Sequence, residues 1–393
     1  MKKVAVVTGT RADYGLLYWV IKALDQSDDF ELQLLVCGTH LIESFGNTRQ
    51  EIVEDGFSNL FNVSFPYPED TRSGMSRATG EAVIAFTDAY EKLGPDLMLV
   101  LGDRYEAFAA TQAAALMAIP VAHLHGGELT EGAIDDCLRH AMTKLSRWHF
   151  VATDEYRQRV IQMGEFPDNV FNVGATGLET LLNETLLTKE ELLSSLPLKT
   201  LSKPTFLVTY HPETMGAGTD GFSQLTNALD RFDDVQILFT APNIDSGGQD
   251  LLHRTKRYVE QRSNAYFVES LGRKRYLSAL QYVDCVIGNS SSGVIEVPSF
   301  HLPTVNIGAR QKGRLSADSV IHCEPDYESI VESIDKATSE SFRSFCKTVV
   351  NPYGQGQTSD NILEILRSLD WSKADLGKAF HDVEFSAAEG KTW

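Results

Sequence analysis

The stretch Gly288-Asn289-Ser290-Ser291-Ser292-Gly293-Val294-Ile295-Glu296 is a hydroxyl-rich turn between two apolar runs. The run before it, Val283–Ile287, predicts a buried parallel strand, and the run Val294–Val297 predicts a short helix that ends at Pro298. Because the first amides of a helix are unpaired and its N-terminus is partly positive, such a turn favours a bound anion. Glu296, one turn into the helix, suits a ribose diol better than a phosphate. The stretch therefore predicts either a nucleotide diphosphate site or a serine-rich cap in an ordinary α/β domain.

The same alternation of apolar runs and amphipathic stretches continues through most of the chain. In the first half, the runs that predict strands are Val4–Val7, Leu32–Val36, Leu97–Leu101, Val121–Leu124, Phe150–Ala152 and Phe171–Val173. Helical spacing covers Tyr14–Leu24, Gly80–Leu93 and Tyr105–Ala118. In the second half, the strand-like runs are Thr205–Thr209, Val235–Thr240, Tyr266–Val268, Asp284–Ile287 and Thr304–Ile307. Alternating strands and helices predict an α/β fold of two doubly wound, Rossmann-like domains that face a cleft.

The pattern weakens over Leu181–Lys203, which indicates a connector between the two domains. We expect a first domain over residues 1–180 and a second over residues 181–360. Residues 361–393 are expected to form a helix over Asn361–Leu369 and a tail that packs back on the first domain. Lys373–Trp393 is polar, so we expect this part of the tail to be peripheral.

Composition narrows the class of function. The chain has 393 residues and a formal net charge of −19, which argues against a nucleic-acid backbone or a membrane as the main partner. The five cysteines are scattered without CxxC spacing, which indicates a reducing compartment. The apolar run Val4–Val7 is too short for a signal-peptide core, so a cytoplasmic protein is expected. No GxGxxG follows this run, so the sequence predicts no nicotinamide cofactor.

Two loops after predicted strands each place an arginine at the start of a helix. Arg11 follows the first strand, and Arg104 stands beside Asp103 after a later one. A cation at a helix start is unfavourable unless it meets an anion, and arginine binds phosphate through paired hydrogen bonds. The loops therefore predict phosphate contacts and a carboxylate that faces the cleft. The alternatives are that Arg11 pairs with Asp13, that Asp103 caps the helix, and that Arg104 pairs with Glu106.

Titratable side chains gather around the end of the predicted strand Val121–Leu124. They are His123, His125, Glu128, Asp135 and Asp136. Acid–base catalysis needs such groups, in environments that separate their pKa values. Helix capping by the two aspartates and a metal site are the alternatives. No HExxH motif or histidine pair on one helix face supports a metal, so none is expected.

The second half places two more polar groups after strands. His211 precedes Pro212, which favours an extended backbone at the strand end. A histidine at the carboxyl end of a strand in this fold is expected to be functional. Arg310 lies in the basic loop Gly308–Arg314, a candidate for contacts with the remaining phosphate charge. The alternative is a solvated basic turn.

Taken together, the loop motifs resemble those of the hydrolysing UDP-N-acetylglucosamine 2-epimerases, in the order found in that family. They are GTRADYG, GDRYEAF, HLHGGE, IDDCLRHAMTKLS, HPET, GNSSSGVIEVPS and NIGARQKGR. The resemblance runs from about Val4 to beyond Pro352, and the branch that makes N-acetylmannosamine for sialic acid looks most similar. It implies a GT-B-type architecture. It also implies that UDP-N-acetylglucosamine and water give N-acetylmannosamine and UDP, by anti elimination to 2-acetamidoglucal and then hydration.

The resemblance also implies residue roles. The positions that match nucleotide-binding residues are Arg11, Arg104, Ser290, Ser291, Glu296 and Arg310. The positions that match catalytic residues are Asp103, Asp135 and His211. Non-hydrolysing relatives have glutamate where this chain has His125, so either His125 or Glu128 is expected to transfer the proton.

Three other functions stay open at this point. The first is the same reaction on UDP-N,N'-diacetylbacillosamine. The second is a UDP-sugar glycosyltransferase on the same fold, and the third is a non-catalytic UDP-sugar sensor. The many acid–base residues argue against the last two. The resemblance further implies a homodimer or homotetramer.

Overall fold

The computed structural model describes residues 1–43, 48–68, 71–130, 134–212, 220–242, 248–354, 356–371 and 377–383. Two compact units make up the chain. The first contains Met1–Glu128, Ala133–Glu179 and Gly356–Trp393, and the second contains Leu129–Gly132 and Thr180–Gln355. No helix in the described ranges is both long enough and apolar enough to cross a membrane.

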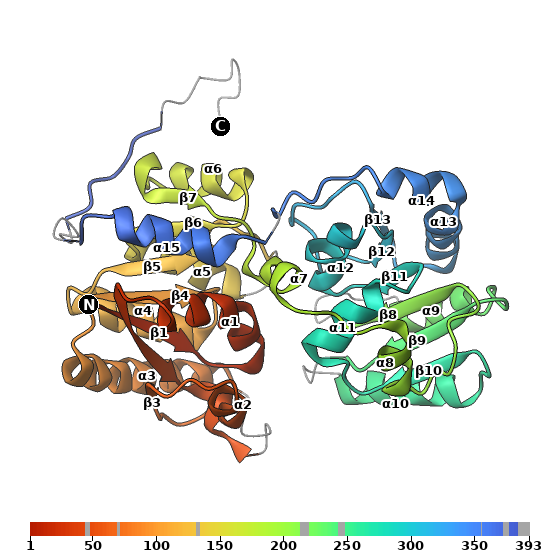
Figure 1. The fold of residues 1–393 in the computed structure, drawn as a ribbon, viewed down its shortest axis with the longest axis horizontal. Coiled ribbons are helices and arrows are strands. Elements are labelled where there is room, and N and C mark those ends of the chain that lie inside the picture. Colours follow the sequence, from red (N-terminus) through yellow and green to blue (C-terminus); the bar gives the residue numbers. More distant parts are fainter. Residues whose placement is uncertain are drawn as a thin grey trace. The chain divides into compact units, whose positions relative to one another are not determined.

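The first unit is built on a parallel sheet with the strand order β3-β2-β1-β4-β5-β6-β7 (Figure 1). The strands are β1 (Lys2–Thr8), β2 (Phe30–Val36), β3 (Leu60–Asn62), β4 (Leu97–Leu101), β5 (Val121–Leu124), β6 (Trp148–Val151) and β7 (Val170–Asn172). Every described pair is parallel, as the alternation of strands and helices predicted. The short edge strand β3 was not predicted.

Helices cover both faces of this sheet. They are α1 (Arg11–Asp25), α2 (Arg49–Glu54), α3 (Arg72–Leu93), α4 (Tyr105–Leu116), α5 (Ile134–Leu145), α6 (Asp154–Gln162) and α15 (Thr358–Ser368), with the short helices η1 (Gly38–Leu41), η3 (Pro167–Asn169) and η4 (Thr176–Leu178). Threonines at positions 10, 71 and 153 cap α1, α3 and α6 through their hydroxyls. One core joins β1, β2 and β4 to α1 and α15, and the other joins their opposite faces to α3 and α4.

The second unit repeats this plan on a parallel sheet of order β10-β9-β8-β11-β12-β13. Its strands are β8 (Thr205–Thr209), β9 (Gln236–Thr240), β10 (Ala265–Val268), β11 (Cys285–Gly288), β12 (Thr304–Ile307) and β13 (Val320–Cys323). Its helices are α8 (Lys189–Ser194), α9 (Gly221–Leu229), α10 (Gly248–Glu260), α11 (Gly272–Leu280), α12 (Ser291–Ile295), η5 (Val297–Phe300), α13 (Tyr327–Thr338) and α14 (Glu340–Cys346), and α7 (Glu179–Asn183) begins at the limit between the units. The predicted two-unit α/β fold is thus confirmed.

The helix predicted over Val294–Val297 is present but misplaced. The chain instead forms α12 over Ser291–Ile295, with Ser290 as its N-cap, and then the 3₁₀ helix η5, which contains Pro298. Proline is accepted in the first turn of a helix because its missing N–H would have no partner there. Pro298 therefore starts a helix here and does not end one.

Residues 377–383 lie at the surface of the first unit, as the sequence predicted, but Lys378 makes a contact that the sequence did not indicate. The ammonium group of Lys378 lies 2.8 Å from both carboxylate oxygens of the buried Glu165, and 2.7 Å from the Ser146 carbonyl. Phe380 covers Gly164, where a Cβ would lie 2.2 Å from its ring. A buried carboxylate needs cationic partners, and Lys378 supplies one from a distant part of the chain.

Candidate functional site

The strand orders place a topological switch point in each sheet. In the first unit it lies between β1 and β4, and in the second between β8 and β11 (Figure 1). Loops leave the carboxyl ends of two such strands in opposite directions, which makes this position the usual ligand site of an open parallel sheet. The predicted site residues follow β1, β4 and β5 in the first unit and β8, β11 and β12 in the second. They therefore gather at or next to the switch point of each unit.

His125 and Glu128 form a close pair after β5. The distance between His125 Nδ1 and Glu128 Oε1 is 2.6 Å, and only 13% and 6% of the two side chains are exposed. The other ring nitrogen, Nε2, lies 3.1 Å from the Thr176 hydroxyl. His125 has a φ of 63°, in the left-handed region that a residue with a side chain rarely adopts. Such strained backbone is common where a side chain must be aimed at a ligand.

A second acidic group surrounds Arg139 on α5. This buried guanidinium pairs with Asp103 after β4, lies 3.3 Å from Asp136, and donates a 2.8 Å hydrogen bond to the Glu128 carbonyl. Burial, together with the nearby Asp103 carboxylate, raises the pKa of Asp135. Proteins separate the pKa values of neighbouring acid–base groups in this way.

His123 is buried on β5 and faces α5. Its Nε2 lies 2.7 Å from the Gly102 carbonyl, directly before Asp103, and its Nδ1 lies 3.3 Å from the Thr143 hydroxyl. Burial lowers the pKa of His123 to about 3, so the ring is neutral at physiological pH. The neutral His123 ring therefore holds the loop that carries Asp103 without adding a positive charge beside it.

The two arginines at helix starts are placed differently. Arg11 begins α1 and pairs with Glu51 on α2 at 3.1 Å, not with Asp13. Arg104 precedes α4 and lies 3.2 Å from the buried Glu106, the pairing that the sequence left open. Burial, opposed by Arg104, raises the pKa of Asp13 to about 6, which adds an acidic group that we did not select from the sequence.

In the second unit, the serine-rich turn follows β11. Gly288 has a φ of 140°, and a Cβ there would lie 1.9 Å from the Thr209 carbonyl oxygen, so only glycine fits between the ends of β8 and β11. Ser290 caps α12, and its hydroxyl makes no capping hydrogen bond within the described part of the chain. Ser291 begins this helix. Burial raises the pKa of Glu296, which follows the last residue of the helix.

His211 and Arg310 reach the same place from β8 and β12. The Arg310 guanidinium donates a 3.2 Å hydrogen bond to the carbonyl of Asn289, and the backbone of His211 pairs with the Asn289 side chain. Burial, with the charge of Arg310, lowers the pKa of His211 to about 4. The second unit thus joins His211, Ser290 and Arg310 in one group around Asn289.

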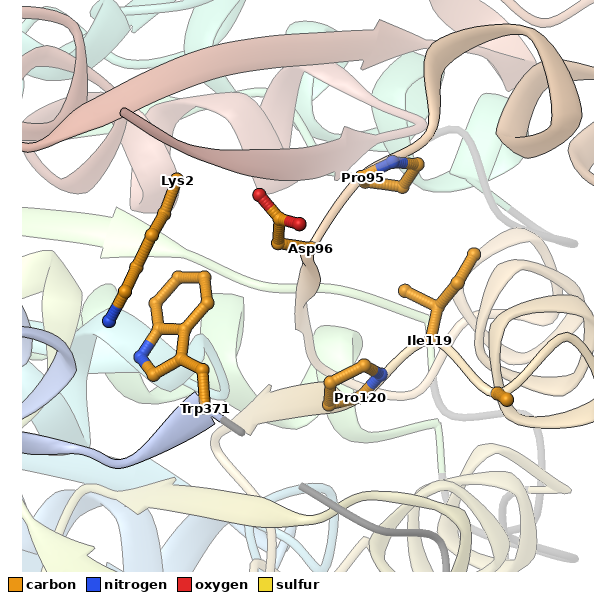
Figure 2. A pocket seen from close by; sticks show the side chains of 7 residues that line it. Lys2, Pro95, Asp96, Ile119, Pro120 and Trp371 are labelled. Carbon is orange, nitrogen blue, oxygen red and sulfur yellow. The ribbon is translucent and has the colours of Figure 1, made fainter. Parts of the chain in front are cut away.

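Two pockets lie away from these candidate residues. One, of about 570 Å³, is at the edge where β1, β4 and β5 begin. It is lined by Lys2, Pro95, Asp96, Ala118, Ile119, Pro120 and Trp371, and Figure 2 shows the Lys2 side chain beside the Trp371 ring. Another, in the second unit, is lined in part by Asp284 and Pro303, at the starts of β11 and β12. Both are at the edge of the sheet opposite to the candidate residues. Among the described residues, no three His, Cys, Asp or Glu side chains could hold one metal ion.

Two α/β units, each with polar loops at the switch point of a parallel sheet, define a protein of the GT-B class of folds. A sequence model of the UDP-N-acetylglucosamine 2-epimerase family matches residues 22–367, and the chain belongs to this family.

Curated relatives with similar sequences agree with this assignment. "Polysialic acid biosynthesis protein P7" of Escherichia coli is 35% identical, over 98% of both chains. "UDP-N,N'-diacetylbacillosamine 2-epimerase (hydrolyzing)" of Legionella pneumophila is 36% identical, over 96% of this chain and 99% of its own. Among solved structures, a UDP-GlcNAc 2-epimerase from Neisseria meningitidis bound to UDP-GlcNAc superposes with a TM-score of 0.80. It is 18% identical and covers 93% of this chain and all of its own, so it supports the fold.

Proposed function

We propose that this chain is a hydrolysing 2-epimerase that converts UDP-N-acetylglucosamine and water to N-acetylmannosamine and UDP. In the first step a base removes the C2 proton, the C1=C2 bond forms, and the C1–O bond to UDP breaks. In the second step water adds its oxygen to C1 and gives one proton to a base, and an acid delivers a proton to C2 on the face opposite to the one that lost its proton. Atoms and charges balance, and no oxidant, metal or cofactor takes part.

The observation that carries this proposal is the His125–Glu128 pair beside the group around Arg139. The carboxylate of Glu128 orients the ring through Nδ1, and we assign the proton exchange to Nε2, which lies 3.1 Å from the Thr176 hydroxyl. Burial and the Asp103 carboxylate raise the pKa of Asp135, which therefore suits the role of the second acid–base group. We assign the proton transfer to His125 and the orientation of its ring to Glu128.

The leaving UDP needs positive charge and hydrogen-bond donors. We assign these to the hydroxyls of Ser290 and Ser291 and to Arg310, with Glu296 on the ribose. Because α12 has only five residues, its dipole is short, so the hydroxyls and the guanidinium are expected to dominate. Arg11 and Arg104 of the first unit are further candidates for contacts with the nucleotide. His211 is neutral, because burial lowers the pKa of its ring, and can donate or accept one hydrogen bond.

A second substrate is favoured by the names of two relatives. The Legionella protein is named for UDP-N,N'-diacetylbacillosamine, and a Campylobacter jejuni protein is named for GDP/UDP-N,N'-diacetylbacillosamine; each is 36% identical. The same residues would catalyse the same steps on that sugar, since only C4 and C6 differ. A cytoplasmic location and a homodimer or homotetramer complete the proposal, and sedimentation velocity tests the assembly.

The test is incubation of the pure protein with each UDP-sugar in deuterated water, followed by proton NMR of the product. We expect free UDP and a manno-configured product that carries deuterium at C2. The ratio of kcat/KM for the two sugars identifies the substrate. A product with full protium at C2 and the gluco configuration would refute the epimerase mechanism and leave simple hydrolysis or sugar transfer.

A further inference from the structure

Asn289 is completely buried between the ends of β11 and β8, at the switch point of the second sheet. Its side-chain oxygen accepts a hydrogen bond from the His211 N–H at 2.7 Å, and its side-chain nitrogen donates one to the His211 carbonyl at 2.9 Å. The two bonds hold the backbone of His211 on both sides of its Cα. Asparagine suits this position because its short side chain offers an acceptor and a donor together.

The main chain of Asn289 is engaged as well. Its N–H donates to the Thr209 carbonyl at 3.2 Å, and its carbonyl accepts from Arg310 at 3.2 Å and from the buried Gln311 at 2.9 Å. Asn289 is therefore bonded to the loops that follow β8 and β12, while it belongs to the loop that follows β11. These three strands are neighbours in the sheet.

We propose that Asn289 is a positioning residue of the UDP-sugar site. The carboxamide of Asn289 positions His211, and the main-chain carbonyl of Asn289 positions Arg310. The inference rests on the proposed function of this site. Asn289 makes five hydrogen bonds to four residues, which is a rigid connection, and an apolar side chain could fill the same gap without holding His211. Two groups that must meet one ligand from different strands then keep a fixed separation.

The matched control is Asn306 on β12. It is also buried, in the same sheet, and its amide nitrogen lies 3.1 Å from the ring of His322, which has no assigned role in the site. Asn289→Ala and Asn306→Ala each remove one buried carboxamide, so both are expected to lower the melting temperature. Asn289→Asp and Asn306→Asp keep the shape and replace the donor by an oxygen.

Three measurements follow for each folded variant: UDP affinity by calorimetry, the split between kcat and KM, and NMR titration of the His211 ring. Asn289→Ala and Asn289→Asp should each weaken UDP binding about tenfold or more, whereas the Asn306 variants should change it less than about twofold. In the Asn289 variants the pKa of His211, which burial and Arg310 hold at about 4, should rise toward the ordinary histidine value of 6.5. If Asn289→Ala does not fold, Asn289→Ser replaces it.

Two results would overturn the inference. The first is a folded Asn289→Ala with wild-type UDP affinity and an unchanged His211 titration. The second is weaker binding in Asn289→Asp alone, since added negative charge would then explain the loss. If the folded wild type neither binds UDP nor turns over a UDP-sugar, the proposed function fails, and the His211 titration still decides whether Asn289 positions that residue.

Discussion

Replacing Glu128 by glutamine removes one negative charge from the side of His125 with little change in shape. The two side chains are 2.6 Å apart and mostly buried, so water cannot replace the carboxylate. A hydrogen bond to a charged group in such a place contributes roughly 1.5–3 kcal/mol. If the pair acts during proton transfer, this free energy is lost from the transition state. We therefore expect kcat/KM to fall roughly tenfold to a hundredfold, since about 1.4 kcal/mol corresponds to a factor of ten.

The assay follows UDP release in water and deuterium entry at C2 in deuterated water, for Glu128→Gln and His125→Gln side by side. His125→Gln should stop both signals, because we assign the proton exchange to the His125 ring. Glu128→Gln should slow both and keep UDP affinity. Glu155→Gln is the matched control. Glu155 pairs with Arg159 at 2.9 Å on the surface of α6 and is 46% exposed, so its loss should change kcat/KM less than about twofold.

Two results would refute this reasoning. A Glu128→Gln variant as active as the control would show that the carboxylate has no part in the reaction. A Glu128→Gln variant without activity, beside a His125→Gln variant that retains some, would assign the proton transfer to Glu128.

Further outcomes are expected. Asp135→Asn should lose most turnover and keep UDP affinity by calorimetry; weakened UDP binding would place Asp135 in the nucleotide site instead. Arg310→Ala should weaken UDP binding by about 1–3 kcal/mol, with Arg343→Ala, a surface arginine paired with Asp284, as control. Chelation should leave turnover unchanged, and activity that disappears and returns with a divalent ion would contradict this. Burial alone would raise the pKa of Glu165. The hydrogen bonds from its basic partners lower this pKa by more, so it falls from 4.5 to about 2. This contribution to the free energy of unfolding is complete above pH 4.5 and lost as the pH falls toward 2, and Lys378→Met should reduce it, measured by thermal melts from pH 7 to pH 3.

Much of the fold is predictable because its strands are short apolar runs and its ligand loops follow them. Alternation along the chain implies parallel sheets, and the carboxyl ends of parallel strands lie on one edge. The missed strands, β3 and β13, are at sheet edges and are only partly buried, so their apolar signal is weak. The helix at the serine turn was misplaced because the turn itself provides its first residues.

The site was harder to predict where contacts join distant residues. Arg139 meets Asp103 across 36 positions, Asn289 meets His211 across 78, and Lys378 meets Glu165 across 213. No local pattern indicates such partners, because each depends on which strands become neighbours. Side chains that follow a strand could be selected from the sequence, whereas those that hold them in place could not.

The return of the chain to the first unit after residue 356 affects how the protein can fold during synthesis. The second unit consists almost entirely of one continuous stretch, Thr180–Gln355, so it can complete its core while later residues are still inside the ribosome. We expect the first unit to complete its core later, because Ile362, Leu363 and Leu366 of α15 are buried in it and Lys378 is a partner of its buried Glu165. Although residues 1–179 are synthesised first, their core is completed only when α15 has been synthesised. During that interval the uncovered apolar surface of the first unit is available to chaperones and proteases. The second unit, which is synthesised later, is expected to finish folding first.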